Sequence, residues 1–220
     1  MQHISTARSE SQILATNKVL RNTYALLSMT LLFSAATAGI SMVMNLPFFN
    51  PILTLVGYFG LLFATTKFRN SSLGLLFVFM LTGFMGLTLG PILNAYLATA
   101  NGGQLVMTAL GGTGVIFLAL SGYALTSRKD FSFMGGFLMV GLFVVLGAAL
   151  LNIFMGWPAL FLAVNAGIVL IMSGLILYET SAIIHGGETN YIMATASLFL
   201  SILNLFQALL HLLGAFSGDD

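Results

Sequence analysis

Seven long apolar runs, separated by short polar breaks, take up almost all of this 220-residue sequence. Each run is at least about 17 residues long, which is enough for a helix to cross the hydrocarbon core of a bilayer. The breaks between them are too short to hold a separate domain, so one helical bundle is expected. The runs cover approximately residues 23–45, 50–66, 72–99, 104–127, 132–156, 159–184 and 190–216.

The composition agrees with a membrane protein. Apolar residues make up 58% of the chain and charged residues 6%, whereas a soluble domain has roughly 25% charged residues. We predict an all-α, polytopic integral membrane protein in which residues 23–216 form one seven-helix transmembrane domain. Residues 1–22 are expected to be a cytoplasmic N-terminal tail, and residues 217–220 a short C-terminal tail. The absence of cysteine excludes disulfides and thiolate metal sites.

The basic residues indicate how the helices are oriented. In the seven-helix topology every Lys and Arg falls on one side of the membrane, which the positive-inside rule makes the cytoplasmic side. The N-terminus is therefore predicted inside and, after an odd number of crossings, the C-terminus outside. Six crossings would put the C-terminus inside, but the last run is apolar enough to cross. The basic residues are Arg8, Lys18, Arg21, Lys67, Arg69, Arg128 and Lys129.

Glu179 is the one carboxylate inside an apolar run. An ionised carboxylate at the centre of a bilayer costs about 2.5–3.5 kcal/mol on insertion scales, so such a residue is a functional-site candidate by default. It lies about eight residues, or roughly 12 Å, from the cytoplasmic turn. That depth is level with residues 195–197 of the last run and about one turn short of Ser201. We favour a buried carboxylate, either partnered or protonated, over one that snorkels to the surface.

A polar stripe follows one face of the last run. Ser197, Ser201, Asn204 and His211 are spaced by four, three and seven residues, which places them on one side of a helix. Gln207 lies at the edge of that side. Two interpretations are open: hydrogen bonds between helices, or a wetted pathway beside a central helix.

Basic residues at the cytoplasmic ends of the runs are available counter-charges for Glu179. Lys67 and Arg69 belong to one loop, and Arg128 and Lys129 to another. A contact between Glu179 and one of these cations would respond to proton uptake. The hypothetical ion pathway or gate consists of Glu179, Ser197, Ser201, Asn204, Lys67 and Arg69, with a calcium ion near Glu179 as the one metal considered.

Pro91 follows Gly90 inside the third run and precedes Asn94. A proline within a span removes one backbone hydrogen bond and frees a carbonyl, which protein or water must satisfy. A plain kink is the simpler interpretation, and a kink that lines a cavity with Pro91 and Asn94 is the alternative. The many glycines of the middle runs indicate close helix packing rather than a phosphate-binding loop.

Some classes of function find no support in the sequence. No nucleophile–base arrangement and no HExxH-type pair of metal ligands is present, so we expect neither an enzyme nor a cofactor. No basic patch of any size is present, which argues against nucleic-acid binding.

Several segments form motifs: GPILN at residues 90–94, RKDFSF at 128–133, YET at 178–180, HGGETNY at 185–191 and SLF at 197–199. With the seven runs, they resemble the Bax inhibitor family, most closely its bacterial YccA-like branch, over nearly the whole chain. The resemblance implies six helices around a central seventh. It also implies a bacterial inner-membrane protein with its C-terminus in the periplasm, which binds the membrane-anchored AAA+ protease FtsH. Such a protein is degraded by FtsH from its N-terminal tail and modulates its action on other substrates.

Other members of that family act as proton-sensitive calcium leak channels, which use an acid on each of the last two helices and a basic latch. In this sequence the first acid corresponds to Glu179, a glutamate instead of the usual aspartate, and the second to Ser201. The acid pair is therefore incomplete, because one Glu beside a Ser cannot share a proton as two carboxyls do. Protease modulation is the leading hypothesis, a cation leak the second, and transport of a small solute the third.

Overall fold

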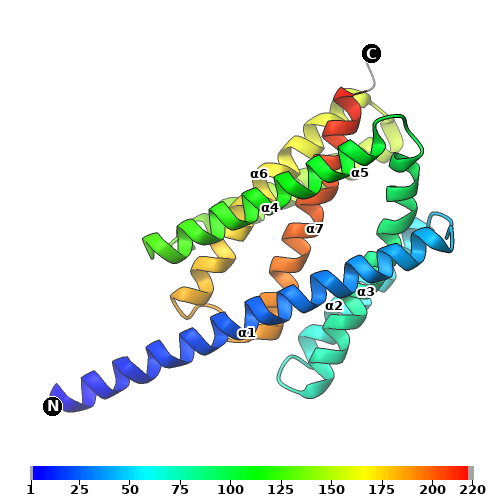
Figure 1. Ribbon diagram of the computed structural model, residues 1–220. Coiled ribbons are helices and arrows are strands. Elements are labelled where there is room, and N and C mark those ends of the chain that lie inside the picture. The colour runs from blue at the N-terminus through cyan, green and yellow to red at the C-terminus, as the bar shows by residue number, and fades with distance from the viewer. Residues whose placement is uncertain (1, 218–220) are drawn as a thin grey trace.

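The computed structural model describes residues 2–217 of the chain, and the side chains of residues 14–217. This part contains seven α-helices and one short 3-10 helix (Figure 1), which confirms the prediction of an all-helical fold. Most helices begin and end close to the limits of the apolar runs. They are α1 (Gln2–Val43), α2 (Pro51–Lys67), α3 (Ser72–Leu97), α4 (Gly102–Ser127), η1 (Ser132–Met134), α5 (Gly135–Met155), α6 (Pro158–Ile184) and α7 (Tyr191–Phe216).

The first helix differs most from the expected span, because it begins at Gln2 and not near residue 23. The sequence contains neither Gly nor Pro between Gln2 and Gly39, so nothing interrupts the helical backbone in the polar segment. The apolar part that could cross a membrane starts at Leu14. The segment predicted as a tail is thus continuous with the first span, and its cytoplasmic location stays a prediction.

Six of the helices are long and apolar enough to cross a membrane. The remaining one, α2, has 17 residues and is apolar but shorter. Asn50 starts it by accepting hydrogen bonds from the backbone N–H groups of Ile52 and Leu53, and Pro51 occupies the first turn, where no N–H is needed. A seventh crossing therefore remains a prediction that rests on the run of apolar residues.

Helix α7 is the most enclosed of the helices, since half of its most apolar window is buried. It packs against α1, α2, α3, α4 and α6. Phe199, Leu205 and Leu210 on α7 have no exposed surface. In contrast, α5 packs only on α6 and η1, and Leu138 is its one buried residue. The predicted ring of six helices around the seventh is therefore not confirmed, because α5 does not pack on α7.

Helices α1 and α3 form the closest helix pair. A Cβ atom added at Gly86 would collide with the Thr37 hydroxyl and the Ser34 carbonyl, and one at Gly90 would collide with Ser41. These glycines let the two backbones approach, which is how helices associate in lipid. The packing interpretation of this part of the glycine-rich sequence is correct.

Candidate functional site

Glu179 lies in the last third of α6, and its carboxylate meets α7. The Ser201 hydroxyl lies 3.3 Å from Oε1 and 3.2 Å from Oε2 and donates to the carboxylate. Ser201 is buried, and Glu179 is partly buried. The expected pair from the two helices is therefore in direct contact, although its second member is a hydroxyl.

The contact is one turn deeper along α7 than the expected level at residues 195–197. The direction of the side chains explains the difference, because a helical side chain leans toward the N-terminus of its own helix. Since α6 and α7 are antiparallel, Glu179 leans away from the turn that joins them while Ser201 leans toward it. The two side chains thus reach each other across about one turn.

The next residue, Thr180, joins three helices. Its hydroxyl lies 3.3 Å from the hydroxyl of Tyr24 on α1 and 3.2 Å from the hydroxyl of Ser121 on α4. Thr180 has no exposed surface, and Ser121 is also buried. Buried hydroxyls that satisfy one another fix the relative rotation of the helices, so Glu179 sits beside a firmly held junction.

Lys67 and Arg69, two of the possible counter-charges of Glu179, take part in other contacts. Lys67 ends α2 with its Nζ 5.7 Å from the centre of the Phe68 ring, and the backbone carbonyl of Arg69 accepts a 2.9 Å hydrogen bond from Asn190 Nδ2. Among residues 14–217, no Lys or Arg nitrogen comes within 4.0 Å of the Glu179 carboxylate. The near partner of this carboxylate is thus Ser201.

His185 ties the loop between α4 and η1 to the end of α6. Its Nδ1 lies 2.9 Å from the Ser181 carbonyl oxygen, and its Nε2 lies 3.1 Å from the Arg128 carbonyl oxygen. The Ser181 hydroxyl accepts a 3.0 Å hydrogen bond from the backbone N–H of Phe131. The HGGETNY and RKDFSF motifs therefore meet in space, although they are about 50 residues apart in sequence.

Asp130 closes the turn in this loop. Its Oδ1 accepts a 2.8 Å hydrogen bond from the Ser132 backbone N–H. This bond, with a smaller contribution from the Ser132 hydroxyl, lowers the pKa of Asp130 below its ordinary value of 3.8, and the nearby His185 acts in the same direction. No pattern in the sequence indicated this cap.

Pro91 sits inside α3, which continues through it to Leu97. The proline leaves the Leu87 carbonyl without its helical donor. The Ser41 hydroxyl on α1 donates a 2.8 Å hydrogen bond to that carbonyl. Asn94 Nδ2 donates a 3.1 Å hydrogen bond to the Met42 carbonyl, near the end of α1. Ser41 and Asn94 thus join α1 to α3, and the Ser41 hydroxyl satisfies the freed carbonyl.

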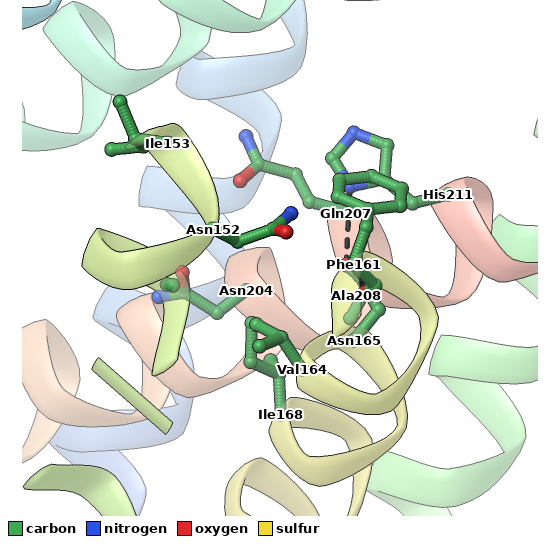
Figure 2. A pocket seen from close by; sticks show the side chains of 11 residues that line it. Asn152, Ile153, Phe161, Val164, Asn165, Ile168, Asn204, Gln207, Ala208 and His211 are labelled. Atoms are coloured by element: carbon green, nitrogen blue, oxygen red, sulfur yellow. Dashed lines mark hydrogen bonds between the residues drawn. The ribbon is translucent and has the colours of Figure 1, made fainter. Parts of the chain in front are cut away.

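The polar stripe of α7 occupies a face that is less covered than the rest of the helix. Ser197, Asn204, Gln207 and His211 are each partly exposed, whereas Ser201 is buried against Glu179. Toward the end of the helix the partly exposed positions border a pocket of about 310 Å³ between α5, α6 and α7 (Figure 2).

Two lining residues of this pocket escaped the sequence analysis. Asn152 on α5 and Asn165 on α6 are single amides within very apolar runs. Asn165 is buried, and its Oδ1 lies 3.2 Å from Nδ1 of His211 (Figure 2). A polar side chain inside an apolar run costs free energy in lipid, and this cost could have identified both amides. It was used above only for the charged residue, Glu179.

Some arrangements are missing from this site. Within the part of the chain that the structure describes, no three His, Asp or Glu side chains gather in a way that could hold a metal ion.

The fold and the polar interior thus define a polytopic helical membrane protein with a partly polar innermost helix.

Comparisons with known proteins give this class a family. The family model described as "Inhibitor of apoptosis-promoting Bax1" matches residues 16–218. The chain therefore belongs to the Bax inhibitor family, as the motifs predicted.

Among its relatives, the "Modulator of FtsH protease YccA" of Escherichia coli K12 is 54% identical over 98% of both chains. The same protein of another E. coli strain is called "Inner membrane protein YccA". A protein of Pseudomonas aeruginosa, PA2604, is 55% identical over 92% of this chain and 91% of its own. A membrane protein of Vibrio cholerae is 49% identical over 96% of both chains. The resemblance to the YccA-like branch is thus confirmed.

Proposed function

We propose that this chain is a non-catalytic, inner-membrane modulator of a membrane-anchored AAA+ protease of the FtsH type, and that the protease also degrades it. The support comes from the name of its 54% identical relative, which covers the same length. The single structural observation that favours engagement is the N-terminal part of α1, which extends past the other helices (Figure 1).

The start of α1 offers a segment that a protease could seize before the bundle opens. Leu14, with 69% of its surface exposed, makes little contact with the bundle, whereas Val19 and Leu20 already pack against the core and Thr23 is fully enclosed. A deletion that ends at residue 13 therefore keeps Val19, Leu20 and Thr23, which pack on or within the bundle. Segments with few buried contacts open at low free-energy cost, and proteolysis starts there.

The test compares three forms of the chain in cells that contain the protease. The full chain should co-purify with the protease and be turned over. A form without residues 2–13 should persist longer. A form with those residues replaced by an equally long Gly/Ser segment separates length from sequence, because it is turned over only if length is what the protease requires. Equal turnover of all three forms would contradict engagement at this end.

We also propose the orientation that the basic residues favour: all seven helices cross the membrane, the N-terminus lies in the cytoplasm and the C-terminus in the periplasm. The innermost position of α7 in a ring of six helices is part of this proposal. It is supported by the packing of α7 on five helices. The sixth helix, α5, borders the pocket that lies beside the polar face of α7 and so covers part of that face.

A cation leak near Glu179 is the second candidate function, and one contact favours it. The carboxylate of Glu179 meets Ser201 at the position where an acid pair would form. In a leak gated by this contact, Glu179→Gln lowers the calcium flux, and Ser201→Asp, which completes the acid pair, raises the flux and makes it depend on pH.

Vesicles loaded with a calcium dye would compare the parent, Glu179→Gln and Ser201→Asp between about pH 6 and pH 8, because a gate made of two coupled carboxyls responds to proton uptake. Equal flux in all three would remove Glu179 and Ser201 from any gate.

A further inference from the structure

The pocket between α5, α6 and α7 has mostly apolar walls, into which a few polar groups and no charged side chain are set. It holds about 310 Å³ and lies toward the end of α7, beyond the Glu179–Ser201 contact. Asn152, Asn165, Asn204, Gln207 and His211 supply its polar groups, and Phe161 lies among its apolar walls (Figure 2).

Backbone partners fix the orientation of three of the amides. Asn165 Nδ2 donates to the Phe161 carbonyl at 2.8 Å, and Asn204 Nδ2 donates to the Leu200 carbonyl at 2.8 Å. Asn152 Oδ1 accepts from the Trp157 N–H at 3.0 Å. Because a carbonyl accepts and an N–H donates, none of these amides can be turned over without losing its bond. Asn204 therefore offers its Oδ1 as a free acceptor, and Asn152 offers its Nδ2 as a free donor.

The fixed amide of Asn165 also determines the state of His211. Its Oδ1 can only accept, so the His211 Nδ1 at 3.2 Å must carry the proton. In the neutral form of the ring with this tautomer, Nε2 is an acceptor. Tyr96 and Phe161 flank the ring, with centroids 6.2 Å and 5.4 Å from its own. The ring is thus held in place with one acceptor unused.

The residues that carry these unused groups line the pocket, and the groups are not enclosed by protein. Thr23 Oγ1 is the one enclosed side-chain oxygen or nitrogen without a partner among the described residues. The free atoms of Asn204, Gln207 and His211 are therefore accessible. In the membrane-spanning part of a helix such groups cost free energy unless something hydrogen-bonds to them.

We propose that this pocket binds a small, neutral, hydroxyl-rich molecule, with a vicinal diol of the glycerol type as its simplest form. Asn204 Oδ1 and His211 Nε2 are acceptors in fixed positions, and Asn152 Nδ2 is a fixed donor. The amide of Gln207 can donate or accept. This set matches hydroxyl groups, because each hydroxyl both donates and accepts. No carboxylate, ammonium or guanidinium lines the pocket to hold an ion. The volume is at the lower end of the range for small-molecule sites. The diol could come from a free solute or from the headgroup of a neutral lipid.

Saturation-transfer NMR on the purified full chain tests the site with glycerol as the probe. Glycerol 3-phosphate is the charged counterpart. We expect transfer to glycerol and much weaker transfer to glycerol 3-phosphate. Asn204→Leu and Gln207→Met, which keep the side-chain size but remove the polar atoms, should each weaken glycerol binding about fivefold, the value of one neutral hydrogen bond.

Ser197→Ala is the matched control, because Ser197 lies on the same face of α7 but outside the pocket. It should leave the glycerol signal unchanged. Nanodiscs with and without diacylglycerol separate the two sources: displacement of glycerol by diacylglycerol supports the headgroup, and an unchanged glycerol signal supports the free solute.

Three outcomes would overturn the proposal. They are the absence of transfer to glycerol in nanodiscs of either composition, equal transfer to glycerol 3-phosphate, and an unchanged signal in both Asn204→Leu and Gln207→Met. The last would mean that glycerol binds the protein outside this pocket.

Discussion

At the scale of single residues, the structure shows how one helix repairs a gap in another. Pro91 leaves the Leu87 carbonyl without its helical donor, and the Ser41 hydroxyl supplies one. A proline of this kind is tolerated in lipid only where a neighbour completes the hydrogen bond. The side chain of Ser41 therefore has a partner that only the proline makes available.

The Ser41→Ala variant should destabilise the protein by about 1 kcal/mol, as for other hydrogen bonds between membrane helices. In a Pro91→Ala background the cost should fall toward zero, because residue 91 regains an N–H that can donate to Leu87. Unfolding in mixed micelles of the parent, the two single variants and the double variant would measure the coupling. An equal cost of Ser41→Ala in both backgrounds would mean that Ser41 acts only by packing.

The carboxyl of Asp130 should titrate below 3.8, because the Ser132 N–H stabilises its charged form. A group whose pKa is lowered by folding stabilises the protein above its unfolded pKa, and this contribution disappears as the pH falls through the folded pKa. Carbon-13 NMR of the carboxyl would follow the titration. Ser132→Ala should raise the midpoint only part of the way, since the backbone bond survives. A parent midpoint at or above 3.8 would exclude the cap.

At the scale of helices, close approach and loose attachment occur in the same molecule. Helices α1 and α3 touch through Gly86 and Gly90, while α5 is held only by α6 and η1. The stability of the bundle should therefore depend strongly on the contact between α1 and α3.

Gly86→Ala should destabilise the protein by about 1–3 kcal/mol, because the added methyl group would overlap the Ser34 carbonyl and push α1 away from α3. Gly39→Ala is the control on the same helix pair, since nothing lies within 4 Å of its Cβ position. That variant should equal or exceed the parent in stability, because alanine favours the helix by up to about 1 kcal/mol. Similar losses in both variants would refute the role of close approach.

The sequence was a good guide to helix limits and a poor one to helix neighbours. Breaks such as Asn45–Pro47 and Ser127–Asp130 mark where apolar runs stop, and helices end there. Lipid and protein interior are both apolar, so the pattern of a run does not say which face meets which helix. Glu179 was recognised from its cost, and the family resemblance paired it with Ser201, which it contacts at 3.2 Å, while the amides of Asn152 and Asn165 became apparent only in three dimensions.

At the scale of the whole molecule, the number of crossings depends on α2, the shortest of the apolar helices. If α2 crosses, the loops before and after it lie on opposite sides of the membrane. The absence of native cysteine makes this easy to test, because any introduced thiol is unique.

Single variants Phe48→Cys, Asn70→Cys and Asn101→Cys place a thiol in three successive loops, each at an exposed position. With the N-terminus inside, a membrane-impermeant maleimide should react in spheroplasts with the first and third, and with Asn70→Cys only after permeabilisation. Labelling of positions 48 and 70 from the same side would mean that α2 does not cross, and the C-terminus would then lie in the cytoplasm.

The burial of α7 also has a consequence for how the protein is made. Synthesis proceeds from the N-terminus, so the helix that packs against five others leaves the ribosome after all of them. Until then the earlier helices have no partner for the surfaces that α7 will cover. The strongly apolar α5, which needs almost no protein neighbour, can reside in the bilayer alone during that interval. Assembly of the bundle is thus completed by its last helix, and a chain that stops before Tyr191 lacks its interior.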